Sequence, residues 1–143
     1  MSKPTSENWN GCAFRYAATV LGDAWMLLIL RDLMFRKARH FGDFVAAGEG
    51  ISTNILTDRL TRLEAEGVIG RAPDPDNRVR VIYSLTEKGR ALAPVLLAMV
   101  DWSASWDPAT EVPQDFIAGY RDQPELFCRA LIRTLEGAQW RPD

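Results

Sequence analysis

The chain has 143 residues, of which 47% are hydrophobic, a size and composition that fit one folded globular domain. Its formal net charge is −2, and its two cysteines, Cys12 and Cys128, are too few for a disulfide framework and suit a reducing compartment. The longest apolar run, Ala24–Leu30, is shorter than the roughly 18 residues of a membrane-spanning helix, and the N-terminal residues show no signal-peptide core. We therefore expect a cytoplasmic protein without a membrane segment.

The first part of the chain predicts three helices. One is expected over Cys12–Leu21, and a second, apolar on nearly all sides, runs from Ala24 to about Phe35 as the centre of the core. Asp23 is placed to cap this second helix, and basic residues at 36–40 should end it. A short third helix is expected from Phe41 to Ala47.

The most informative pattern follows the third helix. A helix capped by Ser52 should run to about Glu66, and strands are expected at Val68–Pro73 and Arg78–Leu85, joined by a turn at residues 74–77. A helix followed at once by a basic two-stranded hairpin is the layout of a winged helix-turn-helix. Such a unit places one helix in the DNA major groove and the hairpin, or wing, beside it.

The C-terminal part is expected to be helical. Thr86 can cap a fifth helix that reaches about Trp106, in which Pro94 should cause a kink or an early break. Residues 107–123 show no clean helical period, whereas Pro124 can open a last helix.

The expected fold class is therefore mostly α with a small β-hairpin. We expect a winged helix-turn-helix domain with dimerisation helices over residues 1–106, and a C-terminal helical extension of the same domain over residues 107–143. Residues 52–90 hold seven basic and six acidic side chains, whereas residues 91–143 hold four basic and eight acidic ones. The acidic charge thus lies away from the expected DNA-binding face, although an acidic tail that only aids solubility would look the same.

One face of the fourth helix is expected to contact bases. Leu56, Leu60 and Leu63 fall on one side and should pack inward, leaving a polar face outward. Asn, Thr and Arg can bond base edges, and a helix N-terminus can bind phosphate. A merely solvated face would have the same composition, and the Asp58 carboxylate is repelled by DNA unless it accepts from a cytosine amine. The candidate contacts are Ser52, Thr53, Asn54, Thr57, Asp58, Arg59 and Arg62.

The second strand adds cations to this surface. Its residues alternate between a set expected to pack on the domain (Val79, Val81, Tyr83, Leu85) and a set expected to face outward (Arg78, Arg80, Ile82, Ser84). Asn77, Arg78 and Arg80 are the candidate DNA contacts of the wing, because phosphate contacts supply much of the free energy of binding. An ordinary edge strand protected by charge is the alternative.

Four segments between Cys12 and Trp102 stand in a characteristic order: LGDAWMLLILRDLMF, RHFGDF, GISTNILTDRLTRLEAEGVIGR and VIYSLTEKGRAL. In them the chain resembles the HxlR-type family of bacterial winged-helix regulators, a branch close to the MarR-type regulators. The resemblance implies a homodimer whose two recognition helices read a pseudo-palindromic operator, as a repressor of transcription. The terminal helices would form the interface, with Leu96, Met99, Trp102, Trp106, Phe127 and Leu131, although such an apolar stripe can also be core. The role of residues 113–143 stays open.

The resemblance also implies a signal. Several family members sense electrophiles or oxidants through a cysteine at the position of Cys12, and oxidation there would shift the recognition helices and alter DNA affinity. A small buried residue at a helix start is the alternative for Cys12. Cys128 is expected to be buried. A small apolar effector bound among the aromatic side chains is a further alternative.

Other classes of function have little support in the sequence. His40 is the only histidine, and neither it nor the two cysteines show nucleophile or metal-ligand spacing. No glycine-rich phosphate loop is present in the sequence. We therefore expect no catalysis, no metal and no cofactor. A winged helix that binds protein instead of DNA is the remaining alternative, which Asp58 and the acidic isoelectric point would suit.

Overall fold

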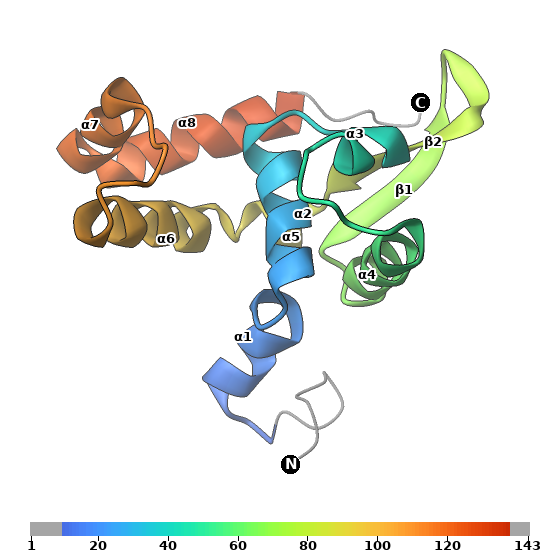
Figure 1. Cartoon of the computed structure of the whole chain (residues 1–143), viewed down its shortest axis with the longest axis horizontal. Helices are drawn as coiled ribbons and strands as arrows, with labels where there is room; N and C mark the ends of the chain where they lie inside the picture. The colour runs from blue at the N-terminus through green and yellow to red at the C-terminus, as the bar shows by residue number, and fades with distance from the viewer. Residues whose placement is uncertain (1–9, 138–143) are drawn as a thin grey trace. The chain divides into compact units, whose positions relative to one another are not determined.

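The computed structural model describes residues 10–137 (Figure 1). The chain divides into two compact units, of which the first ends at Thr86 and the second begins at Glu87. This division precedes the boundary expected at Trp106, so the helix that ends at Trp106 belongs to the second unit.

The first unit consists of short helices and one hairpin, in the order α1 (Ala13–Leu21), α2 (Ala24–Phe35), α3 (Phe41–Val45), α4 (Thr53–Ala65), β1 (Ile69–Asp74) and β2 (Asn77–Leu85). Helix α2 is the core helix, as expected, because Met26, Ile29 and Leu30 are almost fully buried. The Asp23 carboxylate caps it by accepting from the Met26 N–H at 3.1 Å. Burial of α2 holds the neighbouring elements of this unit together.

Helix α4 has the start and the orientation that the sequence predicts. Ser52 Oγ accepts from the Ile55 N–H at 3.2 Å, which caps the helix. Leu56, Leu60 and Leu63 are buried on its inner side. The helix gives way to β1 through Gly67, whose φ of +73° lies in the left-handed region that favours glycine. Tertiary packing therefore fixes which face of α4 is exposed.

The hairpin is an antiparallel pair with an irregular tip. Its register runs from Ile69 opposite Leu85 to Pro73 opposite Val81, and then passes directly to Asp74 opposite Asn77. Residues 78–80 of β2 therefore have no partner on β1 and form a bulge.

The burial of β2 differs from the expected alternation. Ile82, expected to face outward, is 4% exposed, whereas Val79, expected to pack inward, is 93% exposed. The prediction failed because residues 77–80 are all exposed, and beyond them Ile82 and Leu85 are buried while Val81, Tyr83 and Ser84 are only partly buried. The exposed stretch includes the bulge at residues 78–80, which pairs with nothing on β1, so strand alternation does not govern burial there.

The second unit contains α5 (Glu87–Arg90), α6 (Ala93–Trp106), α7 (Gln114–Asp122) and α8 (Pro124–Gly137). The single fifth helix expected from the sequence is broken early, and Pro94 lies in the first turn of α6, where its missing N–H costs no helical hydrogen bond. Helix α7 was not expected at all. It is held to α6 by Arg121, whose Nε donates to Asp101 Oδ1 at 2.6 Å and whose Nη2 donates to Ser105 Oγ at 2.9 Å.

Among the described residues, no single helix is long and apolar enough to cross a membrane. Helices α1 and α2 pass such a test of length and composition only as a pair, and they are bent by 73° at their junction.

Candidate nucleic-acid interface

The outer face of α4 is polar and exposed. Thr53, Asn54, Thr57 and Thr61 are exposed along the helix. The hydroxyl groups of Thr57 and Thr61 donate to the carbonyls of Thr53 and Thr57, both at 2.8 Å. Their protons are thus used within the helix, and each threonine keeps oxygen lone pairs and a methyl group toward solvent. Together with the Asn54 amide, this face can bond base edges and cover a thymine methyl.

The charged residues of α4 form a connected chain. Arg59 Nε donates to Asp23 Oδ2 at 3.1 Å, and Arg59 Nη1 donates to Asp58 Oδ2 at 2.5 Å. Arg62 Nε lies 3.8 Å from the same Asp58 oxygen. Arg59, expected to reach DNA from the edge of the helix, is therefore occupied by two carboxylates of the fold, and its side chain is only 19% exposed. Asp58 and Arg62, at 55% and 48%, remain open to solvent.

This chain of charges changes the proton affinities of its members. Burial opposes ionisation of Asp23, but the Met26 N–H and the Arg59 guanidinium outweigh it, so the pKa of Asp23 lies below its ordinary value. The hydrogen bond to Asp23 raises the pKa of Arg59. Both groups are thus held in their charged forms. The sequence suggests Asp23 as a cap, but its pairing with Arg59 joins residues too distant in the chain to be read there.

The wing presents two exposed arginines, Arg78 and Arg80, of which Arg80 helps to lower the pKa values of Asp43 and Asp74. Arg78, Val79 and Arg80 are exposed in the bulge of β2. Within the described part of the chain, neither Arg78 nor Arg80 has an ion pair within 4.0 Å. Asn77 lies at the turn, where its Oδ1 accepts from the Val79 N–H at 3.2 Å. Asp74 Oδ1 likewise accepts from the Asp76 N–H at 2.9 Å, so local side-chain bonds shape the tip.

A histidine connects the wing to the helix-turn-helix through a hydrogen bond. His40, at the start of α3, donates from Nε2 to Asp74 Oδ2 at 2.8 Å, and its Nδ1 lies 3.7 Å from Asp43. This hydrogen bond is the largest cause that holds the pKa of Asp74 below its ordinary value. Beside it, the N–H of Tyr83 donates to the Arg39 carbonyl at 2.7 Å, so the segment before α3 lies along β2. No pattern in the sequence connects His40 with the wing.

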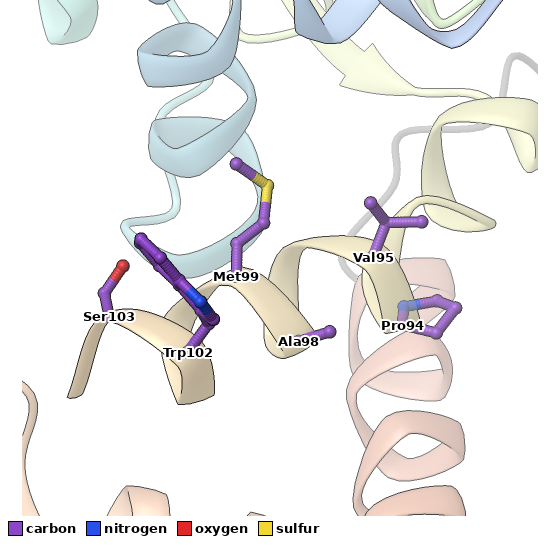
Figure 2. Close-up of a pocket in the computed structure, with 6 residues that line it drawn as sticks. All are labelled: Pro94, Val95, Ala98, Met99, Trp102 and Ser103. Atoms are coloured by element: carbon purple, nitrogen blue, oxygen red, sulfur yellow. The ribbon is translucent and has the colours of Figure 1, made fainter. Parts of the chain in front are cut away.

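The apolar residues expected at a subunit interface occupy two environments. Leu96 is 4% exposed and thus belongs to the buried core of the chain. Trp102 and Trp106 are 67% and 77% exposed. Figure 2 shows Val95, Met99 and Trp102 projecting toward the same side of α6, where they line an open groove together with Pro94, Ala98 and Ser103. This face of α6 offers a continuous apolar surface.

Helix α8 holds the other two expected interface residues. Phe127 is partly buried and packs edge to face against Phe116 and Tyr120 of α7, with ring centroids 5.1 and 6.0 Å apart. Leu131 is also partly buried. These contacts hold α7 and α8 together within one chain.

The two cysteines differ in access. Cys12 is a free, exposed thiol at the N-terminus of α1, and Cys128 is free and partly buried on α8. Burial raises the pKa of the Cys128 thiol, which favours the neutral thiol over the more reactive thiolate. Among residues 10–137, no three His, Cys, Asp or Glu side chains are grouped as a metal site requires.

The fold and this polar surface define a winged helix-turn-helix. The model of the HxlR-like helix-turn-helix family matches residues 20–111, and the chain belongs to that family. It is 39% identical over 97 residues to YvaP, an uncharacterized HTH-type transcriptional regulator of Bacillus subtilis (strain 168). The matched stretch covers 67% of this chain and 89% of the relative.

Solved structures agree with this assignment. The chain is similar to the crystal structure of PA1607, with a TM-score of 0.67 and 34% identity over 77% of this chain and 75% of that one. It is also similar to the redox regulator HypR in its oxidized form, with a TM-score of 0.58 and 31% identity over 66% of this chain and 96% of that one. The protein is thus a transcriptional regulator of the helix-turn-helix type.

Proposed function

We propose that this regulator binds double-stranded DNA directly, as a homodimer on a pseudo-palindromic operator, and represses transcription. The observation that carries the proposal is the pairing of an exposed polar face on α4 with a wing whose exposed arginines, Arg78 and Arg80, form no ion pair within 4.0 Å among the described residues. Base edges require the first kind of surface, and phosphates require the second. In this arrangement Asn54, Thr57, Asp58 and Arg62 contact bases, and the wing contacts the backbone.

The start of α4 adds a second phosphate contact. The helix has 13 residues, and its first N–H groups have no partner within the helix. Ser52 and Thr53 stand at this end, where the helix dipole favours an anion. Such contacts fix the register of the helix in the groove without reading sequence.

The proposed homodimer rests on the apolar face of α6. Large exposed apolar surfaces on a folded chain mark contacts with other molecules, and two exposed tryptophans on one helix are costly in water. In a twofold dimer the same face of each protomer would pack against its copy. Sedimentation should show a dimer that Trp102→Glu dissociates, whereas a wild-type monomer at micromolar concentration would contradict the proposal.

We also propose that Cys12 senses an oxidant or an electrophile and that its modification releases the DNA. Access is the supporting observation, since the Cys12 thiol is exposed while Cys128 is partly buried. The likeness to a structure named as a redox regulator supports the same assignment. The variant Cys128→Ser is the matched control, because it removes the other thiol of the chain.

Fluorescence anisotropy with DNA from upstream of the protein's own gene tests these proposals. A scrambled DNA of equal length controls for sequence, and each sample is measured with reductant and with oxidant. We expect tight, salt-sensitive binding to the upstream DNA alone, lost on oxidation in the wild type and Cys128→Ser but retained in Cys12→Ser. Loss of binding in oxidised Cys12→Ser would reject the sensing role. No binding to any DNA at low salt would favour a winged helix that binds protein.

A further inference from the structure

Two oppositely charged side chains stand together on the exposed face of α4. Asp58 and Arg62 are one helical turn apart, are about half exposed, and approach to 3.8 Å between Arg62 Nε and Asp58 Oδ2. They share this face with Asn54, Thr57 and Thr61. Any DNA that lies along α4 therefore meets a carboxylate and a guanidinium side by side.

The position of Asp58 is fixed by the fold. Its Oδ2 accepts from Arg59 Nη1, and the Nε of the same guanidinium donates to Asp23, the residue that caps α2. The two N–H groups of Arg59 thus connect the recognition helix to the N-terminus of the core helix. A planar guanidinium held at both sides allows little rotation, so Asp58 is oriented before DNA arrives.

The same contacts offset the charge that would repel DNA. An isolated carboxylate at a DNA surface faces the phosphates unfavourably. Asp58 lies between the guanidinium groups of Arg59 and Arg62, and together with Asp23 these four side chains carry two positive and two negative charges, so the group has no net negative charge. Both contacts are to Oδ2, and Asp58 retains its second oxygen as an acceptor.

Of the base pairs, C·G matches this pair of side chains. In the major groove cytosine presents the N4 amine as a donor, and guanine presents O6 and N7 as acceptors. Carboxylates accept from cytosine N4, and arginine donates to guanine O6 and N7 as the commonest specific contact. The acceptor of Asp58 and the donors of Arg62 are therefore complementary to the two edges of one pair.

On the basis of the DNA-binding function proposed above, we propose that Asp58 and Arg62 read one C·G base pair in each half-site. Asp58 accepts from the cytosine N4 amine, and Arg62 donates to guanine. Arg59 touches no base and is a positioning residue, which transmits the placement of α2 to Asp58.

Selection from a randomised duplex library, followed by sequencing, tests this inference. The full-length wild type, Asp58→Asn, Arg62→Ala and Arg59→Lys are compared with Asp122→Asn, which makes the same chemical change at an exposed site in the second unit. Thermal melting by circular dichroism confirms that each variant is folded. The wild type and Asp122→Asn should require C·G at one position of each half-site.

The variants should change that position alone. Asp58→Asn should shift the preference from C·G to A·T, because asparagine pairs with adenine N6 and N7. Arg62→Ala should weaken the C·G preference by about 5- to 150-fold. Arg59→Lys should broaden the preference without changing its identity, which a merely structural loss would not do.

The outcomes separate this inference from the function on which it rests. An unchanged C·G requirement in Asp58→Asn would overturn the reading role of Asp58 while leaving DNA binding established. A wild type that prefers A·T at the affected position would do the same. A wild type that enriches no sequence would overturn the proposed function and this inference with it.

Discussion

Helix α4 and the wing use the same residue type in opposite ways. The arginines of α4, Arg59 and Arg62, both lie within 4 Å of a carboxylate, whereas Arg78 and Arg80 of the wing have no such partner among the described residues. A paired guanidinium has a defined orientation but little free charge to offer. An unpaired one has full charge but no fixed direction. The first suits recognition of bases and the second suits attraction of phosphates, so under the proposed function α4 would supply specificity and the wing would supply affinity.

The largest effect is expected from the double substitution Arg78→Ala with Arg80→Ala. Loss of two phosphate contacts should lower affinity about 100-fold for every sequence at roughly 0.1 M salt, and should reduce the slope of log affinity against log salt by about two units. Anisotropy titrations over a series of salt concentrations measure both quantities.

Arg71 provides the matched control for this experiment. It lies on β1 of the same hairpin but stands 3.9 Å from Glu64, so its charge is already balanced. Arg71→Ala should leave the salt slope unchanged. An equal loss of slope in both proteins would show that total charge matters and would remove the distinction between paired and unpaired arginines.

An intermediate effect is expected from Asp23→Asn. Asparagine caps a helix as well as aspartate does, so the variant can keep the cap of α2 with its one amide oxygen, while the negative charge and the second oxygen that hold Arg59 are lost. We expect the free energy of unfolding to fall by about 1 kcal/mol, and the preference for one base pair to broaden through Arg59 and Asp58. Denaturant titrations measure the first quantity. A stability loss without any change in base preference would separate Arg59 from recognition.

The smallest expected effect is a change in the free energy of unfolding at acid pH. Because the pKa of folded Asp23 lies below its ordinary value, the stability from this carboxylate is fully present above the unfolded pKa of about 3.9 and is lost as pH falls through the lower folded value. The difference in unfolding free energy between the wild type and Asp23→Asn should therefore be constant at neutral pH and shrink below about pH 4. A difference that persists in acid would mean that Asp23 acts through shape rather than charge.

The sequence predicted most elements of the fold because their signals are local. The apolar run of α2, the cap at Ser52 and the turn before Asn77 each lie within a few residues of the element that they define. The exposed face of α4 followed in the same way from the spacing of its leucines. Helix α7 was not predicted because it is short, contains Gly119 and follows Pro113, so its apolar residues show no clear helical period.

The remaining features depend on contacts between distant parts of the chain. Nothing near Arg59 indicates that its partner is Asp23, and nothing near His40 indicates Asp74, since only folding brings these pairs together. Bulges are equally hidden, because strand alternation assumes a regular partner. Sequence reasoning therefore predicted a candidate DNA-facing surface as a set of residues, but it could not show which of the charged side chains are already paired within the fold.

The bulge in β2 also bears on how this protein changes over generations. Residues 78–80 pair with nothing on β1, while Ile82 stays fixed opposite Ala72 in the buried base of the hairpin. Insertions, deletions or exchanges at the tip therefore leave the register of the base intact. Mutations can therefore change the length or the charge of this segment without changing the fold of the domain.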